Sequence, residues 1–371
     1  NIGMVYLVTA FLISLVVTAG LVRYKNVHSR FTADSDLTGV QKYHAIPVPR
    51  VGGLALWMGM FAVCVPVTFR EPEVLVSLLL LWLCALPAFF GGLAEDLTKK
   101  IRPKYRMLLI ALSGVLIYLF LDADVTRLNI IGLDWLLGFA VVSFIATIIV
   151  ICGAANAINI IDGYNGLAAV VSALIFAGFG YVSFYLGDRL LVIVCVSMIG
   201  VIGGFLICNY PRGLIFLGDG GAYFIGYMMG AVSILLLQRH PQVSAWFPLL
   251  LCFYPVFETL FSIYRKKVVR GTSPGMPDGV HLHMLIYKRL VRWVEAGPRA
   301  ERTKTQRNAL TSPYLWVFSS LAGVPAVLFW DEQPVLIAFV LLFSVSYVLL
   351  YRALVLFKMP QWLVLKKKAK K

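Results

Sequence analysis

Residues 91–104, GGLAEDLTKKIRPK, mark the point where a long apolar run stops at two adjacent carboxylates and a cluster of cations. The carboxylates are Glu95 and Asp96, and Lys99 follows three residues after Asp96. Carboxylates beside such a run cost several kcal/mol unless they are paired, hydrated or bound to a cation. This stretch therefore predicts the polar end of a hydrophobic helix, with a specific partner for its acids.

The rest of the chain is equally apolar. Its 371 residues are 60% hydrophobic and have a mean hydropathy of +0.84, which excludes a single soluble domain. Apolar runs of roughly 17 to 25 residues, enough for one bilayer crossing, recur from end to end. We predict an all-α, polytopic integral membrane protein with about eleven transmembrane helices. The expected spans are 3–22, 51–69, 74–93, 107–121, 135–152, 167–186, 190–208, 222–237, 246–264, 313–330 and 334–357.

The cations predict the orientation, because short loops rich in Lys and Arg stay on the cytoplasmic side. Of the 33 Lys and Arg residues, Arg70, Arg127, Arg189 and Arg239 fall on one side, Arg352 lies inside the last span, and the rest fall on the other. The N-terminus is therefore expected outside and the C-terminus in the cytoplasm. We expect one transmembrane domain over 1–371, a cytoplasmic loop at 265–312 and a basic tail at 358–371.

Several features have ordinary explanations. The first span is too long and too poor in basic residues at its start for a signal peptide, so we expect a retained helix. The six cysteines stand singly in apolar runs and indicate small core side chains. Topology explains most of the net charge of +15, and a phosphorylated substrate is the alternative. We find no internal repeat, which disfavours inverted-repeat transporters.

Four polar segments fall at the same predicted membrane boundary. They carry Glu95 and Asp96; Asn156, Asn159, Asp162 and Asn165; Asn209; and Asp219. Any one acid at a helix end can simply mark the headgroup boundary. Hard oxygen ligands from separate loops, however, suit Mg²⁺, which usually bridges few carboxylates to substrate phosphates. Glycines beside the acids in NAINIIDGYNGL and FLGDGG indicate tight turns or close approach to a ligand, so phosphoryl transfer is the leading hypothesis.

The loop at 265–312 carries SPGMPDGVHLHM, whose Pro and Gly content predicts an irregular segment rather than a helix. His281 and His283, two residues apart, would share one face of an extended chain and could donate to phosphate oxygens; two solvated histidines are the alternative. The following residues, MLIYKRLVRWVEAG, predict a short interfacial helix.

Two further candidates lie elsewhere in the chain. Lys42, His44 and Arg50 precede the Gly pair that opens the second span. Glu258 lies inside the ninth span, where an acid is either functional or a buried structural partner of a cationic loop.

Four motifs together, GGLAEDLTKK, NAINIIDGYNGL, FLGDGGAYFIG and PDGVHLHM, resemble those of the polyprenyl-phosphate N-acetylhexosamine-1-phosphate transferases. The resemblance runs from about Gln41 to Met284. It implies transfer of a sugar 1-phosphate from a UDP-N-acetylhexosamine to undecaprenyl phosphate, with release of UMP, and dependence on Mg²⁺ or Mn²⁺. It also implies a multi-pass protein of the bacterial inner membrane with a cytoplasmic active site, in lipopolysaccharide or cell-wall biogenesis.

The resemblance also implies roles for individual residues. Asp219 matches the metal ligand, Glu95 and Asp96 match the acidic pair, and Lys99 matches the basic member of that motif. Asn156, Asn159, Asp162 and Asn165 match the segment that helps to form the nucleotide and metal site. Asn209 matches an amide near the uridine, His281 and His283 match the histidine loop, and Lys42 matches an early lysine.

Three positions depart from the family pattern: Glu95 replaces an Asp, Met284 replaces a histidine, and Ala222 replaces a small hydroxyl residue. The HLH loop is more similar to that of the lipopolysaccharide-type enzymes than to that of the pentapeptide transferase. A transporter or flippase for an anionic lipid or solute is the rival from another class, and an inactive scaffold is a third hypothesis. The expected partners are the UDP-sugar, the lipid phosphate and the bilayer, with no nucleic acid; a homodimer is left open.

Overall fold

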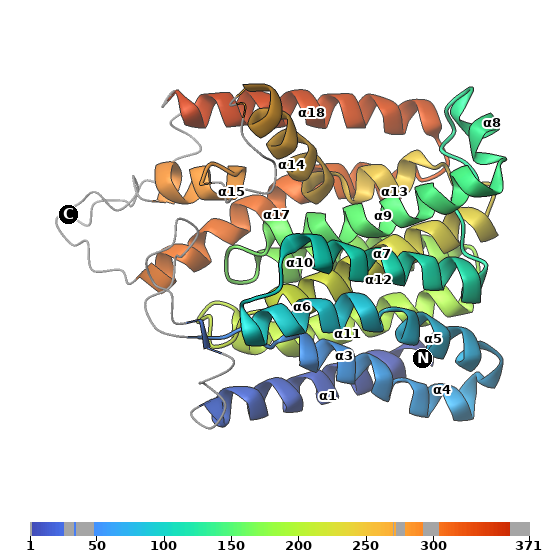
Figure 1. The fold of residues 1–371 in the computed structure, drawn as a ribbon, viewed down its shortest axis with the longest axis horizontal. Coiled ribbons are helices and arrows are strands. Elements are labelled where there is room, and N and C mark those ends of the chain that lie inside the picture. Colours follow the sequence, from blue (N-terminus) through green and yellow to red (C-terminus); the bar gives the residue numbers. More distant parts are fainter. Residues whose placement is uncertain are drawn as a thin grey trace.

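The computed structural model describes residues 2–25, 33–34, 48–269, 271, 279–291 and 304–356. Within them the chain is a bundle of helices lying side by side, with α15 at one end and α8 (Leu133–Leu137) at the other (Figure 1). A two-stranded antiparallel pairing joins β1 (Ala33–Asp34) to β2 (Val48–Pro49), with Ala33 opposite Pro49. The predicted all-α class is therefore confirmed.

The helices of the first half follow the expected spans. They are α1 (Ile2–Arg23), α3 (Gly53–Ala62), α4 (Cys64–Arg70), α5 (Pro72–Cys84), α6 (Leu86–Thr98), α7 (Pro103–Leu121) and α9 (Ala140–Ile161). The second half contains α10 (Leu167–Tyr185), α11 (Arg189–Asn209), α12 (Gly218–Arg239), α13 (Trp246–Leu251), α14 (Phe253–Tyr264), η1 (Arg265–Val269), α15 (Leu282–Leu285), η2 (Ile286–Val291), α17 (Lys304–Leu328) and α18 (Gln333–Val355).

Prolines mark the breaks inside three of the expected spans. Pro66, Pro87 and Pro255 each lie in the first turn of the helix that follows a break, in α4, α6 and α14 respectively. A proline there loses no hydrogen bond, because the first amide groups of a helix have no partner inside it. The expected span 246–264 is therefore divided into α13 and α14 at Cys252.

Nine helical segments of the described chain are long and apolar enough to cross a bilayer. They account for all the expected spans except 246–264, which is divided, and 313–330, most of which lies in the longer α17. The protein is thus a multi-pass membrane protein, while the count of eleven and the orientation stay predictions. Exposed apolar residues at helical spacing, such as Val141, Ile145 and Ile149 of α9, suit contact with lipid.

The helix α12 lies at the centre of the bundle and is buried over nearly its whole length. It packs against α9, α6 and α3, while α1 packs on α11 at one side of the bundle. Because α12 begins at Gly218, this arrangement places the first turn of a buried helix among the ends of α6 and α9.

Two helix bounds differ from the sequence prediction in a way that affects the site. The helix α9 runs to Ile161 rather than ending near residue 152, so Asn156 and Asn159 lie on it instead of after it. Likewise, α12 starts at Gly218, so Asp219 lies in its first turn and not before it. The polar residues continue each helix because their side chains are half-buried or buried among neighbouring helices rather than exposed at a boundary.

Candidate active site

The side chain of Asp96 binds the start of α12. Its two carboxylate oxygens accept the backbone N–H groups of Asp219 and Gly220, each at 2.9 Å, and the side chain is almost completely buried. The first amide groups of a helix lack partners within it, and a carboxylate there is favoured by the helix dipole. Asp96 therefore acts as an N-cap supplied by another helix, and it fixes where Asp219 stands.

This cap requires α6 and α12 to approach closely. A Cβ added at Gly92 would lie 2.5 Å from the backbone of Asp219 and Gly220. At Gly218, which has a φ of 76°, an added Cβ would lie 2.6 Å from Asp96 Oδ2. Both positions therefore need glycine. The sequence analysis expected a tight turn or contact with a ligand at the glycines of FLGDGG, whereas the contact at Gly218 is with the side chain of another helix.

Asp219 stands at the centre of a charged network. Its Oδ1 accepts from Arg50 Nη2 at 3.2 Å and from Asn159 Nδ2 at 3.0 Å, and its Oδ2 accepts from Arg106 Nη1. Arg50 also lies near Asp96, with Nε 3.6 Å from Oδ1. Residues from α6, α7, α9, α12 and the segment after β2 thus meet at one carboxylate.

Backbone pairing positions Arg50. Pro49 O accepts from Phe216 N at 2.8 Å, and Gly52 N donates to Phe216 O at 3.0 Å. The segment after β2 therefore lies alongside the residues that lead into Gly218, and Arg50 is held next to Asp219. The sequence analysis named Arg50 only as part of an early basic loop.

Arg106 is a site residue that the sequence analysis missed. It lies in the second turn of α7, one helical turn before Ile110, and Ile110, Ser113 and Ile117 form the buried face of that helix. Residues spaced by three or four lie on one face. The helical period was thus a usable signal that Arg106 points inward, unlike the exposed Arg102 and Lys104 around it.

Asp162 follows the last residue of α9 and faces the same charges. Burial raises the pKa of its carboxyl to about 7, the nearby Arg50 lowers that pKa, and Asp219 raises it. A carboxyl with this pKa is only partly ionised at neutral pH. Asp162 and Asp219 therefore lie close enough to influence each other, as predicted.

Glu95 and Lys99 take a different position from Asp96. Glu95 Oε2 accepts the backbone N–H of Ile101 at 2.7 Å, which closes the turn between α6 and α7. Lys99 ends α6 in the left-handed conformation, with a φ of 54°, and is exposed. Asp96 thus caps a helix while Glu95 closes a turn, so the two acids of the pair have different structural tasks.

Two of the predicted amides hold loops together. Asn209 is buried, accepts from Gly166 N at 2.7 Å and donates to Ile215 O at 2.8 Å. Asn165 Nδ2 donates to Pro211 O at 3.2 Å. These bonds connect the turn after α9 to the loop before α12. Asn156 lies half-buried on α9, one turn before Asn159.

The histidine segment is buried and attached to two membrane helices. Glu258 of α14, which is fully buried, accepts from His281 Nδ1 at 2.9 Å, from Leu282 N at 3.2 Å and from Tyr347 Oη of α18 at 2.7 Å. The structure thus agrees with the interpretation of Glu258 as a buried partner of this loop. A carboxylate on Nδ1 fixes the orientation of an imidazole and leaves Nε2 for another partner.

The rings of His281 and His283 stack, with centroids 5.3 Å apart and an angle of 8° between their planes. His281 is extended, but α15 begins at Leu282, so the expectation of an irregular segment is wrong for His283 and Met284. His283 is fully buried, and neither ring nitrogen has a hydrogen-bond partner among the described residues. Burial lowers its pKa to about 3, while Glu258 raises that pKa and His281 lowers it.

The histidine segment packs on the turn that follows α9. A Cβ added at Gly163 would lie 3.2 Å from His283 Nε2, and the ring of Tyr164 meets the His283 ring edge-on at 5.5 Å. Helical structure continues through η2, where an interfacial helix was expected, although residues 292–297 of that helix lie outside the described chain. Lys42, His44 and the tail at 358–371 also lie outside it.

The donor set suits a hard divalent ion. Within the described chain, no three His, Cys, Asp or Glu side chains form a metal cluster. Mg²⁺ does not need such a cage, because it usually takes one or two carboxylates, water and substrate phosphates. Asp219, with carboxylate oxygens and an adjacent amide, fits that requirement.

Comparisons with known proteins agree with this site. Residues 78–237 match the family model described as glycosyl transferase family 4, and they include Asp96, Asp162 and Asp219. A phospho-N-acetylmuramoyl-pentapeptide-transferase of Streptococcus pneumoniae (strain Hungary19A-6) is 26% identical over 272 residues, which is 68% of this chain and 81% of that protein.

A second kind of relative matches to a similar extent. An undecaprenyl-phosphate alpha-N-acetylglucosaminyl 1-phosphate transferase of Escherichia coli O157:H7 is 27% identical over 261 residues, covering 68% of this chain and 69% of the relative. These relatives are transferases, which favours an enzyme over the transporter hypothesis. The resemblance found in the sequence is thus confirmed: residues 78–237 of the chain match glycosyl transferase family 4, and the relatives are transferases of the expected kind.

Proposed function

We propose that this protein transfers an N-acetylhexosamine 1-phosphate from a UDP-sugar to undecaprenyl phosphate, releasing UMP, as the first membrane step of a cell-surface polysaccharide. The observation that carries the proposal is the network in which Asp96, Asp219, Asn159, Arg50 and Arg106 meet. Oxygen donors beside cations are what a metal ion and a diphosphate need together.

The residues can perform the transfer without a strong base. A phosphate monoester has a second pKa near 6, so the lipid phosphate is already mostly a dianion at neutral pH. It attacks the β-phosphorus in line, and the bond from that phosphorus to the bridging oxygen breaks, so UMP leaves with that oxygen. The main requirement is relief of charge repulsion, which Arg50 and Arg106 can provide because both are partly exposed.

In this proposal Asp219 holds the divalent ion, which is Mg²⁺ or Mn²⁺, and when bound that ion neutralises charge on the phosphate oxygens. Asp96 keeps Asp219 in place through the backbone of α12. Glu95 is a positioning residue rather than a base, since its carboxylate closes a turn. Asn165 and Asn209 shape the loops around the nucleotide, and His281 and His283 line the phosphate side together with Lys99.

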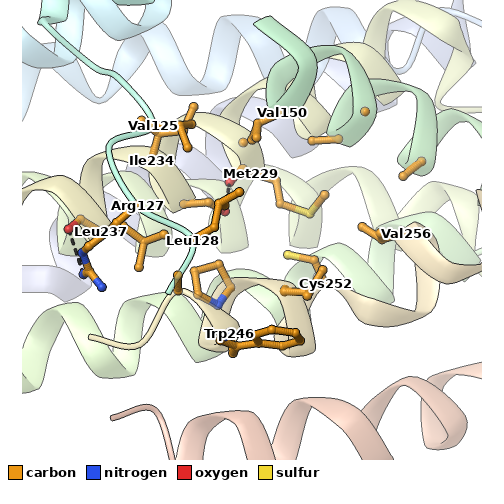
Figure 2. A pocket seen from close by; sticks show the side chains of 18 of the residues that line it. Val125, Arg127, Leu128, Val150, Met229, Ile234, Leu237, Trp246, Cys252 and Val256 are labelled. Atoms are coloured by element: carbon orange, nitrogen blue, oxygen red, sulfur yellow. Dashed lines mark hydrogen bonds between the residues drawn. The ribbon is translucent and has the colours of Figure 1, made fainter. Parts of the chain in front are cut away.

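An apolar cavity of about 380 Å³ can bind part of the acceptor's isoprenoid chain. It lies between α9, α12, α13 and α14, with Arg127 at one end and Val256 at the other (Figure 2). Exposed residues such as Leu260 and Ile130 border it on the outer surface of the bundle. Its wall includes Ala157 of α9, about 7 Å along the helix axis from Asp162. A chain held there would reach the acidic network with its phosphate.

The proposal also covers which UDP-sugar is the donor and which face of the membrane carries the site. Met284, which is buried in α15, stands where the family pattern has a histidine, so the loop of this chain has two histidines. The loop of the pentapeptide enzymes has three. This difference favours a UDP-N-acetylhexosamine without a peptide. The distribution of cations favours a site on the cytoplasmic face, and the family resemblance favours the bacterial inner membrane.

The test is UMP formation by the purified protein in lipid nanodiscs. The protein would receive undecaprenyl phosphate and a panel of UDP-N-acetylhexosamines, with Mg²⁺, with Mn²⁺ and with chelator. We expect UMP only when lipid phosphate, one of the UDP-sugars and a divalent ion are all present. Movement of lipid across the bilayer without UMP would favour a transporter, and binding of a UDP-sugar without turnover would favour an inactive scaffold.

A further inference from the structure

The carboxylate that we assign to the metal is already occupied by this chain's own cations. Arg50 binds Asp219 Oδ1, Arg106 binds Asp219 Oδ2, and Asn159 shares Oδ1. The Asp219 side chain is only 9% exposed, so an ion cannot reach it without disturbing these pairs. This arrangement satisfies a buried charge that would otherwise be costly.

Arg50 and Asn159 occupy Oδ1 and Arg106 occupies Oδ2, which leaves about one of the four lone-pair positions of the carboxylate for a divalent ion. Like charges a few ångströms apart repel strongly in a partly buried site, and a carboxylate has few positions for partners. If the ion binds Asp219, the two arginines must release it. Their side chains are 31% and 18% exposed, which leaves room for them to move.

The backbone of each arginine stays in place when its side chain moves. Arg50 follows the pairing of Pro49 with Phe216, and Arg106 lies within α7. After release, both guanidinium groups therefore remain beside the ion. Guanidinium groups bind phosphate oxygens well, often through two parallel hydrogen bonds. A diphosphate that shares the ion is the matching partner.

We propose that Arg50 and Arg106 are exchangeable counter-cations that hold Asp219 before the metal binds and then transfer to the diphosphate of the donor. The proposal rests on the proposed function, in that Asp219 is the metal ligand. It makes metal and donor binding cooperative, because each ligand removes a competitor of the other, and the coupling must be equal in both directions. A nucleoside diphosphate should therefore strengthen metal binding, and the metal should strengthen nucleotide binding.

The test measures Mn²⁺ affinity by electron paramagnetic resonance on the purified protein, with and without UDP. For Arg106→Gln without UDP, we expect Mn²⁺ to bind about fivefold tighter than to the wild type, because a competitor is removed. The same variant should bind UDP more weakly and should lose most of the tightening of Mn²⁺ by UDP. Arg50→Gln should likewise bind Mn²⁺ more tightly and UDP more weakly than the wild type.

Arg102→Gln is the matched control. It removes the same charge four residues earlier in the chain, but Arg102 is exposed and does not bind Asp219. A general change in electrostatic potential would shift both variants alike, whereas exchange predicts a shift only for Arg106→Gln. Arg106→Lys, which keeps a cation, should give an Mn²⁺ affinity between those of the wild type and Arg106→Gln.

Two outcomes would overturn the proposal, and they differ in whether Asp219 remains assigned as the metal ligand. If Asp219→Asn abolishes Mn²⁺ binding while Arg106→Gln binds Mn²⁺ no more tightly than Arg102→Gln, the exchange is wrong and the metal assignment stands. If Asp219→Asn keeps the wild-type Mn²⁺ affinity, the metal assignment fails and the exchange fails with it. Elution volume and thermal unfolding would verify that each variant is folded.

Discussion

The network around Asp219 and the histidine segment lie at the same end of the bundle but satisfy their polar groups differently. Around Asp219, buried carboxylates are paired with arginines whose side chains are partly exposed. Around His281, a fully buried carboxylate, Glu258, binds an imidazole, a backbone N–H and a buried tyrosine. The first set can exchange partners with ions and phosphates, whereas the second set is fixed.

The difference assigns separate tasks to the two regions. A site that binds a metal and a diphosphate must neutralise changing charge, so its partners need mobility. A group that only orients substrate gains from being held within a narrow range of positions. The last membrane helix serves this second task, because Tyr347 and Tyr351 of α18 bind Glu258 and the backbone of Val280.

After the loss of Asp219 itself, the largest expected effect comes from breaking the fixed region. In Glu258→Ala, the three donors around the lost carboxylate would be left buried without an acceptor, at a cost of about 3 kcal/mol or more. We expect UMP formation to fall by about 100-fold, and thermal unfolding measurements should show a lower Tm. Tyr347→Phe, which removes one bond, should cost only about 1 kcal/mol. Near-normal turnover by Glu258→Ala would show that the histidine segment needs no such support.

A smaller effect is expected when the pH is lowered, because protonation of His283 changes the stability of the protein. The pKa of His283 is lowered to about 3, against about 6.5 in an unfolded chain. Between these values the unfolded chain binds the extra proton, so the free energy of unfolding falls as the pH is lowered from about 7 to 5. Asp162, whose pKa is raised to about 7, contributes in the opposite direction, so the effect of His283 is the difference between the wild type and His283→Gln. We expect the Tm of the wild type to fall by a few °C relative to that of His283→Gln over that range, and equal slopes for the two proteins would contradict the assignment.

The smallest effect is expected for Glu95, at the edge of the exchangeable network. Glu95→Gln keeps an oxygen that can accept from Ile101 N, so UMP formation should fall by less than about threefold at every pH. Glu95→Ala, which cannot accept, should lose more. If Glu95 were the catalytic base, Glu95→Gln would instead be inactive over the whole pH range.

Much of this architecture could be predicted from local sequence. Apolar run length predicted the spans, whereas the close approach of α6 to α12 at Gly92 was not predicted. Asp96, Asp162 and Asp219 were expected to share one boundary; the structure joins Asp96 to the backbone of Asp219, and Asp162 lies within electrostatic reach of Asp219. Each segment is strongly hydrophobic, so the spans and their polar ends can be predicted without knowing which distant residues they contact.

The features that the sequence did not predict depend on contacts between segments far apart in the chain. Nothing local shows that Glu258 meets Tyr347, 89 residues away, or that Asp96 caps a helix starting more than a hundred residues later. The ends of α9 and α12 were misplaced because amides and acids normally mark boundaries, whereas here neighbouring helices bury them. Arg106 alone had a local signal, its place on the buried face of α7.

The most direct test of the whole account is Mg²⁺-dependent UMP release by Asp219→Asn. This substitution keeps the size of the side chain but removes the charge that binds both arginines and that we propose as the metal ligand. The control is Asp331→Asn, an exposed position between α17 and α18. We predict that Asp219→Asn releases no UMP above the chelator background while Asp331→Asn matches the wild type. Near-normal UMP release by folded Asp219→Asn would contradict the central claim.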